Sequence, residues 1–309
     1  MESNHAGSGR GTNERVPKLE LLDEIVYRFV ENLDARTGTP EFPTGIQVID
    51  EGTYGLHRSH LMVIAGRPGE GKTSLCLQMA YNLAKIGKRV AYFSLEMTKE
   101  QMIERLFCNL EGVSSVESRM HREESEPEDR WKIKKSELIR KAQNFGAKLK
   151  NQKVPLHLID DWGRKESEFF HLFNKLKYNP EVIFFDHIQQ INPEKGVSKY
   201  EALDSYLRYL KELAMEQKIA LVVVSQINRQ GENTPTIGNL KGCGSIEELA
   251  DAALLCYQDE EEAKKENSQG NFVIDIAKNR FCVTGERFVW FDKPYFRFLD
   301  YKSMLKHHV

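Results

Sequence analysis

The segment Gly66–Ser74 constrains this chain more than any other part of the sequence. It begins Gly-Arg-Pro-Gly-Glu-Gly-Lys-Thr, which satisfies the phosphate-loop pattern G-x-x-x-x-G-K-[ST] at every fixed position. The apolar, strand-like run Leu61–Ala65 precedes it, and an apolar helical pattern over Thr73–Lys85 follows it. Because strand, loop and helix stand in the required order, the sequence predicts a polyphosphate-binding loop rather than a chance glycine turn.

The residue types of this loop match the needs of a polyphosphate. Glycines let backbone N–H groups turn inward, and the following helix offers unpaired N–H donors at its positive end. Lys72 brings a full charge toward the β- and γ-phosphates, and the Thr73 hydroxyl can join the shell of a Mg²⁺ ion. The predicted nucleotide-binding residues are Gly66, Arg67, Pro68, Gly69, Glu70, Gly71, Lys72, Thr73 and Ser74.

Apolar runs of strand length alternate with helical patterns along most of the chain. This alternation indicates an α/β fold with a mainly parallel sheet covered on both faces. After Asp251 the runs lie close together, which indicates an antiparallel C-terminal extension. The predicted strands are Leu61–Ala65, Arg89–Ser94, Leu156–Asp160, Val182–Asp186, Ala220–Ser225, Ala253–Tyr257, Phe272–Lys278, Arg287–Phe291 and Phe296–Leu299, and the predicted helices are Thr73–Lys85, Lys99–Leu110, Glu166–Leu176 and Tyr200–Gln217.

The chain divides into three parts by composition. Residues 1–16 are rich in Gly, Ser and Asn and are expected to be a disordered tail, and residues 39–309 form the main domain. Between them, Pro17 opens an amphipathic helical pattern that stops near Gly38. Its periodicity leaves open whether this arm packs on its own domain or elsewhere. Residues 130–153 carry nine Lys and Arg against one acid, Glu137; we interpret them as a solvated helix face, with a nucleic-acid patch as the alternative.

Charge and hydropathy exclude two classes of protein. A net charge of -2 excludes a strongly basic protein, although not a locally basic groove. No apolar run approaches the roughly 18 residues of a spanning helix, and the N-terminus has no apolar secretory segment. The five scattered cysteines form no CxxC and favour reduced thiols. We therefore expect no membrane association and a cytoplasmic location, with a host cytoplasm or an organelle matrix left open.

Polar residues at three predicted strand ends are candidates for the chemistry of phosphate cleavage. Asp186 closes the apolar run Val182–Asp186, a Walker B pattern that holds Mg²⁺ through water; the alternative is a strand-end cap. Glu96 lies just past the strand Val90–Ser94 and is either a general base or the N-terminal acid of the next helix. Gln226 follows a third strand, where its amide can sense the γ-phosphate by hydrogen bonding.

Taken in order, many motifs resemble one family, the C-terminal ATPase domain of DnaB-type replicative helicases, within the RecA-like superfamily of P-loop NTPases. The similarity extends over about residues 21–300. The segments that carry it are the helical arm with Arg36–Gly38, then Phe42–Gly45, Ile49–Asp50, Gly66–Ser74, Phe93–Met97, Ile159–Asp161, Phe185–Gln189, Ser225–Arg229, Leu240–Asp251 and Ala277–Arg280.

The resemblance implies a ring, usually a hexamer, with ATP and Mg²⁺ bound between subunits. Glu96 is then the catalytic base, Asp186 the Walker B acid and Gln226 the γ-phosphate sensor. Lys278 and Arg280 resemble the pair that reaches the ATP of a neighbouring subunit. On a strand they point to the same face, although two solvent-facing basic residues would show the same pattern. The helical arm would dock on the adjacent subunit.

The resemblance also implies a DNA site and a function. The segment Asn239–Ser245 is similar to the channel loop that holds single-stranded DNA, where Lys241, Gly242 and Gly244 would contact phosphates without reading bases; the alternative is a helix N-cap loop. The expected function is ATP-driven translocation on single-stranded DNA and unwinding of duplex during replication, with a primase or a helicase loader as partner. A RecA-like DNA-binding or regulatory ATPase without unwinding activity is the alternative, and a nucleotide-binding scaffold without turnover is a third.

Three departures from the family pattern stand out. The N-terminal collar domain is missing, which suggests a minimal motor, a truncated form or a relative that recruits its collar in trans. Lys241–Gly244 differs from the usual Arg-Glu-Ser-Gly and lacks its acid. His187 stands where cellular members usually have Tyr, and the sequence assigns it no catalytic role.

Overall fold

The structure is a computed structural model, and the chain divides into two compact units, Met1–Thr39 and Pro40–Val309. The described residues are 20–34, 40–120, 127–160, 168–169, 173, 178–227, 235–239, 244–265, 268 and 270–300. The predicted tail, residues 1–16, and most of the predicted helix Glu166–Leu176 lie outside them.

The described part of the first unit contains one amphipathic helix, α1 (Leu22–Asp34). It begins at Leu22 rather than at Pro17 as the sequence predicted, and Asp23 and Glu24 stabilise its first turn through the helix dipole. Its apolar side chains Leu22, Ile25, Val26, Phe29, Val30 and Leu33 are exposed.

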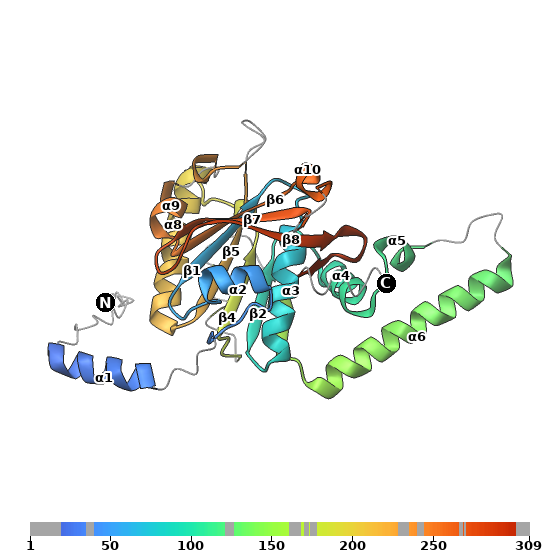
Figure 1. Ribbon diagram of the computed structural model, residues 1–309, viewed down its shortest axis with the longest axis horizontal. Helices are drawn as coiled ribbons and strands as arrows, with labels where there is room; N and C mark the ends of the chain where they lie inside the picture. The colour runs from blue at the N-terminus through green and yellow to red at the C-terminus, as the bar shows by residue number, and fades with distance from the viewer. Residues whose placement is uncertain are drawn as a thin grey trace, which may run out of the picture. The chain divides into compact units, whose positions relative to one another are not determined.

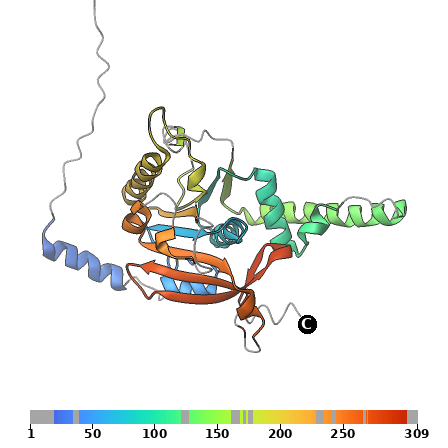
Figure 2. The same cartoon turned by 90° about the horizontal axis from the view of Figure 1, so that it is seen from above.

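The second unit is built on one sheet, which within the described residues has the order β3-β2-β4-β5-β1-β6-β7-β8-β9. The first six strands in this order are mutually parallel, and the last three continue from β6 in antiparallel fashion, as Figure 2 shows for β7 and β8. The strands are β1 (Leu61–Gly66), β2 (Val90–Ser94), β3 (Leu156–Ile159), β4 (Val182–Asp186), β5 (Ala220–Gln226), β6 (Ala252–Gln258), β7 (Phe272–Asn279), β8 (Gly285–Asp292) and β9 (Arg297–Leu299).

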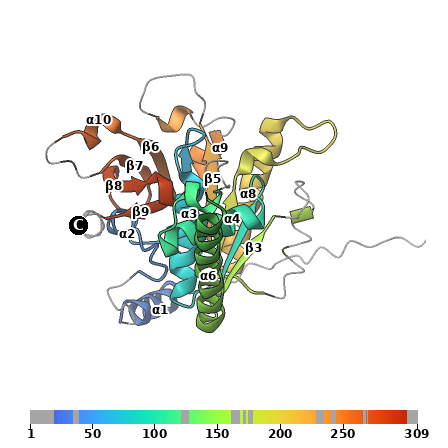
Figure 3. The ribbon, with the colours of Figure 1, turned by 90° about the vertical axis from the view of Figure 1, so that its right-hand side faces the viewer.

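Helices cover both faces of this sheet (Figure 1). Side chains alternate along each strand, so the apolar strands present a hydrophobic surface to the helices on each face. Met62 and Ile64 of β1 face the core under α2, α3 and α4, whereas Leu61 and Val63 face the core under α8 and α9. Figure 3 shows α2 and α8 on opposite sides of the strands. The helices of this unit are α2 (Gln47–Thr53), α3 (Lys72–Lys85), α4 (Lys99–Glu111), α5 (Ser115–Ser118), α6 (Glu128–Gln152), α8 (Lys199–Gln217), α9 (Gly244–Leu249) and α10 (Glu260–Ala263), with 3-10 turns at Ile188–Gln190, Ile237–Asn239 and Lys293–Tyr295.

The basic segment that the sequence analysis singled out lies on α6. Of its side chains, Phe145 is buried, where its ring contacts Phe107 with centroids 5.7 Å apart, and most of the others are exposed. This arrangement agrees with a solvated helix face.

The structure confirms the predicted fold class, a mainly parallel α/β sheet with an antiparallel extension. Each predicted strand is present, with ends that differ from the predicted ones by at most two residues. Within the described ranges, no helix is both long enough and apolar enough to cross a bilayer.

Candidate functional site

Four strand ends meet at one edge of the sheet and form a cleft. Because β1, β2, β4 and β5 are parallel, their carboxyl ends place Gly66–Thr73, Glu96, Asp186 and Gln226 side by side, although these residues lie far apart in sequence. The cleft has a volume of about 250 Å³. Its lining residues are Pro68, Gly69, Gly71, Lys72, Thr73, Ser74, Glu96, Met97, Arg105, Asp186, His187, Gln226, Phe291, Lys293 and Phe296.

The phosphate loop holds a buried cation at the start of α3. Lys72 is 6 % exposed, and its Nζ donates to the carbonyl of Arg67 at 2.8 Å. Burial lowers the pKa of Lys72. Among the described residues no carboxylate forms an ion pair with this ammonium group. A buried cation beside the N–H groups of a helix start is a site for an anion such as a phosphate.

Contacts behind the loop fix it to the end of β6. A Cβ on Gly66 would lie 2.3 Å from the carbonyl oxygen of Cys256, so this position requires glycine. The Glu70 carboxylate accepts the backbone N–H of Gln258 at 2.8 Å. The loop therefore packs closely on β6 at its first residue, Gly66, and is hydrogen-bonded to β6 at its middle, through Glu70.

Two glycines of the loop provide a matched test of its packing. Both have left-handed backbones, with φ of 85° at Gly69 and 84° at Gly71. A Cβ on Gly71 would meet the Phe291 ring at 2.9 Å, whereas one on Gly69 would meet nothing within 4 Å. Both alanine variants pay about 1–2 kcal/mol for backbone strain, and we expect Gly71→Ala to lose about 1–3 kcal/mol more through overpacking. Urea unfolding measures the difference; equal losses would mean that the Phe291 ring moves aside freely.

Asp186 lies at the floor of the cleft with one carboxylate oxygen bonded and one not. It is 2 % exposed, and its Oδ2 accepts the Tyr92 hydroxyl at 2.8 Å. Its Oδ1 is buried and has no hydrogen-bond partner among the described residues. Burial raises the pKa of Asp186, and the hydroxyls of Tyr92 and Thr73 oppose this rise. An orphaned carboxylate oxygen beside a threonine hydroxyl fits the hard, oxygen-rich surroundings that Mg²⁺ prefers.

Glu96 stands over the cleft on the turn after β2. Its side chain is 52 % exposed, and Oε2 lies 2.9 Å from Nδ1 of His187, which is buried. The hydrogen bond from His187 lowers the pKa of Glu96 and so keeps it ionised. The turn is fixed because the Ser94 hydroxyl accepts the N–H of Met97 at 2.8 Å. Sequence analysis gave His187 no role; here it orients the predicted base.

Gln226 ends β5 at the same edge. Its backbone N–H donates to Oε1 of Gln189 at 3.1 Å, while Nε2 of Gln189 donates to the Ser225 hydroxyl at 2.7 Å. Gln189 thus connects the end of β5 to the turn after β4. The backbone of Gln226 is therefore held in place at the point from which its side chain extends.

Sequence analysis missed the part of the cleft wall that comes from α4 and the chain's C-terminal region. Arg105 donates to the Ser74 hydroxyl at 3.2 Å and lies 4.9 Å from the centroid of the Phe296 ring. Phe291 and Lys293 complete this wall. In the sequence, Arg105 stands out only in that its charge lies close to two apolar positions of the predicted helix, Met102 and Leu106.

Lys278 and Arg280 lie at the opposite edge of the sheet. Lys278 pairs with Ala253 near the start of β6, and the N–H of Arg280 donates to the Asp251 carbonyl at 2.9 Å. β7 ends at Asn279, so Arg280 follows the strand rather than lying on it as predicted. Both side chains still point the same way, because both donate to the carbonyl of Glu248.

The two edges are separated by the length of β1. Its six residues span roughly 20 Å at about 3.3 Å each. This exceeds the reach of an arginine side chain, so neither basic residue can contact the cleft of its own chain.

Residues 41–300 match the family model described as the DnaB-like helicase C terminal domain. The chain belongs to this family. It is 30% identical over 269 residues to a probable plasmid replicative DNA helicase of Chlamydia trachomatis, which covers 85% of this chain and 55% of the relative. It is also 30% identical over 285 residues to the replicative DNA helicase DnaC of Bacillus subtilis, with 89% and 60% covered. The chain thus spans somewhat more than half the length of these relatives.

Solved structures of DnaB-like helicases share the fold. A DnaB-like replicative helicase, described with its interactions with primase, aligns with a TM-score of 0.75 and 25% identity, over 90% of this chain and 68% of that one. The ATPase domain of G40P aligns with the same score and identity over 92% and 99%. Likeness to an ATPase domain implies that the cleft of this DnaB-like chain takes a nucleotide.

Of the predicted channel loop Asn239–Ser245, the structure describes Asn239, Gly244 and Ser245. Lys241 and Gly242 lie outside the described residues, and Gly244 is the first residue of α9.

Proposed function

We propose that this chain is the motor of an ATP-driven DNA helicase that forms a ring, moves on single-stranded DNA and unwinds duplex during replication. One observation carries the proposal: the cleft holds a phosphate loop, a base and an acid, while the two cationic side chains of the Ala277–Arg280 segment lie at the far edge. A second copy placed with that edge against the cleft would supply them, which requires assembly. Membership of the DnaB-like family supports the same arrangement.

In this proposal the cleft residues divide the work of ATP hydrolysis. Gly66–Thr73 wraps the phosphates, and Lys72 neutralises charge on the β- and γ-phosphates. Thr73 and Asp186 would hold Mg²⁺, which when bound offsets the charge that develops on the phosphate oxygens. Glu96, oriented by His187, takes a proton from the attacking water. Gln226 donates a hydrogen bond to the γ-phosphate and so distinguishes ATP from product.

The remaining roles lie outside the cleft. Arg280 and Lys278 would stabilise the charge of the neighbour's γ-phosphate, and α1 would dock its exposed apolar face on an adjacent subunit. Lys241, Gly242 and Gly244 would contact DNA phosphates in the channel. We propose a primase as partner, because a similar structure was described with one, and the cytoplasm as the place of action.

The test is strand displacement with protein whose assembly state has been measured. We expect single-stranded DNA to raise the ATPase rate several-fold and a forked duplex to be separated only when ATP is hydrolysed. The control replaces ATP by a non-hydrolysable analogue. If the protein hydrolyses ATP and binds DNA but separates no duplex, the alternative of a DNA-binding ATPase without unwinding activity is correct.

A further inference from the structure

A buried carboxylate, Asp251, lies at the sheet edge opposite the cleft. It is 4 % exposed and lies two residues after the end of α9. Its Oδ2 accepts the N–H of Leu61 at 2.8 Å and the ammonium of Lys211 at 2.5 Å. Its own N–H donates to the carbonyl of Leu61 at 2.9 Å. Asp251 is thus fixed to the first residue of β1, the central strand that ends in the phosphate loop.

The same residue contacts Arg280 twice. Its carbonyl accepts the backbone N–H of Arg280 at 2.9 Å, and its Oδ1 lies 3.3 Å from the guanidinium NH1. The NH2 group of Arg280 donates to the Glu248 carbonyl at 2.7 Å. A guanidinium has five N–H donors, so these two side-chain contacts leave three for a phosphate. The Arg280 side chain is 45 % exposed, so it is anchored along one edge and accessible along the other.

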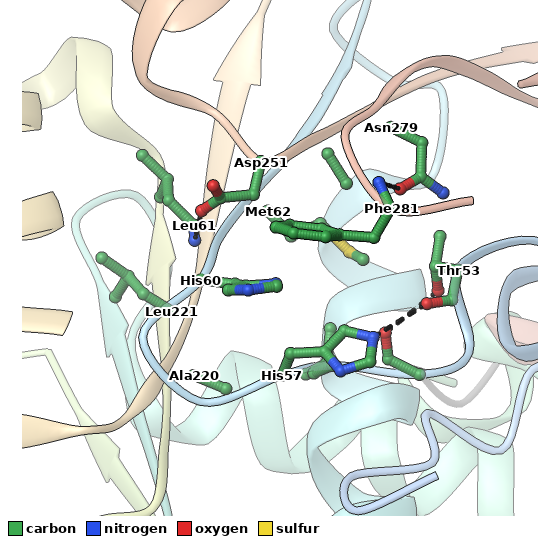
Figure 4. A pocket seen from close by; sticks show the side chains of 13 residues that line it. Thr53, His57, His60, Leu61, Met62, Ala220, Leu221, Asp251, Asn279 and Phe281 are labelled. Carbon is green, nitrogen blue, oxygen red and sulfur yellow. Dashed lines mark hydrogen bonds between the residues drawn. The ribbon is translucent and has the colours of Figure 1, made fainter. Parts of the chain in front are cut away.

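Neighbouring residues hold the backbone around Arg280. The Phe281 ring stacks on His60, with centroids 4.4 Å apart and planes 14° apart, and Figure 4 shows this stack beside Asp251. Before Arg280 in the chain, the Asn279 side chain makes two contacts: its Nδ2 donates to the carbonyl of Gly52 at 3.1 Å, and its Oδ1 accepts the N–H of Phe281 at 3.1 Å. The segment is therefore attached to α2 and to the residue before β1.

We propose that Asp251 is a positioning residue for Arg280: it fixes the guanidinium in the orientation that reaches the nucleotide of a neighbouring subunit. Its carboxylate does not touch that nucleotide. It acts because a guanidinium held on one edge loses little conformational entropy when its other edge meets a phosphate. The inference rests on the proposed function, in which Arg280 acts in trans.

Lys211 makes a buried position for this carboxylate tolerable. Its Nζ bonds both Asp251 and the carbonyl of Ser59, at 2.9 Å, and its side chain is 15 % exposed. Asp251 therefore has two cationic partners: the side chain of Lys211 is 15 % exposed, whereas that of Arg280 is 45 % exposed. This difference allows the structural and the positioning contributions to be separated by substitution.

The experiment is a double-mutant cycle on kcat for ATP hydrolysis, with Asp251→Asn, Arg280→Ala and their combination. Asp251→Asn keeps an oxygen for the N–H of Leu61 but removes the charge that holds Arg280. We expect it to lower kcat about 10- to 100-fold, as small misplacements of catalytic groups do, with KM for ATP within about two-fold of wild type. The combined variant should be no slower than Arg280→Ala alone, because there is then nothing left to position.

In the wild-type background, Asp251→Asn would leave the ammonium of Lys211 without its carboxylate partner. A second pair of variants therefore carries Lys211→Met, which removes that ammonium before Asp251 is changed. Lys211→Met/Asp251→Asn should be slower than Lys211→Met by the same factor, at a melting temperature no lower than that of Lys211→Met, because the neutral asparagine side chain needs no cationic partner.

Each other outcome overturns a distinct statement. If Arg280→Ala is slow and the Asp251→Asn loss multiplies with it, Asp251 acts through the fold and the positioning role is wrong. If Arg280→Ala alone keeps full kcat, the trans role of Arg280 in the proposed function fails, and the positioning role fails with it.

Discussion

Lys72→Ala is expected to lower kcat for ATP hydrolysis by about two to three orders of magnitude while the protein stays folded. The loss follows from removing a preorganised cation from a dry site, where one donor to the transition state contributes a factor of about 10² to 10³. The variant should still fold. Burial of the charged Lys72 side chain is unfavourable, as its lowered pKa indicates, and Ala removes a single hydrogen bond, from Nζ to the carbonyl of Arg67. Steady-state kinetics together with thermal melting make the measurement.

Lys85→Ala is the matched control, because Lys85 lies in the last turn of the same helix with an exposed side chain. It should keep kcat within about two-fold, as surface substitutions away from a site do. Undiminished hydrolysis in Lys72→Ala would disprove the assignment of the phosphate loop.

The parts of the site that the sequence predicts are those whose chemistry is local. The segment Gly66–Thr73 follows its strand and leads into its helix in consecutive residues, and Asp186 closes a run of apolar residues that is typical of a buried strand. Parallel strands then force Glu96 and Gln226 to the same edge, so four separate predictions become one cleft.

The parts that the sequence does not predict depend on packing between distant segments. Arg105 joins the cleft because its guanidinium lies over Phe296, which is nearly 200 residues away and belongs to the antiparallel extension. The contact between Glu96 and His187 likewise needs the turns after β2 and β4 to be adjacent. Sequence periodicity does not predict such contacts, because it describes one helix or strand at a time and not which distant segments pack together.

The location of Arg280 is another feature that the sequence pattern does not predict. A pattern of basic residues at i and i+2 predicts a shared face, and both side chains do reach the end of α9. Only the antiparallel pairing of β7 with β6, and the parallel pairing of β6 with β1, show that this face lies a full strand length from the chain's own phosphate loop. The topology, rather than the residue pattern, therefore places Arg280 out of reach of its own cleft, and in the proposed function its target is the nucleotide of a neighbouring subunit.

Arg280→Ala is expected to lower kcat about 10³-fold or more, and an equal mixture with Lys72→Ala protomers to recover activity. An arginine at the γ-phosphate contributes about 10³ to 10⁵ in rate in other NTPases. The reason for recovery is geometric: an Arg280→Ala protomer has an intact cleft, and a Lys72→Ala neighbour still presents Arg280 to it. Random pairing in a closed ring completes about one cleft in four. The measurement is the ATPase rate after the two proteins have been mixed and allowed to exchange subunits.

The control for this recovery is a mixture of Arg280→Ala with the double variant Lys72→Ala/Arg280→Ala. It has the same assembly and the same number of intact clefts, but no protomer carries the arginine, so it should stay inactive. If mixed rings are verified by mass and the first mixture is also inactive, a cleft does not receive Arg280 from its neighbour. Because β1 separates the two edges within one chain by roughly 20 Å, Arg280 would then have no role in hydrolysis, and the case for a shared site would rest on the family alone.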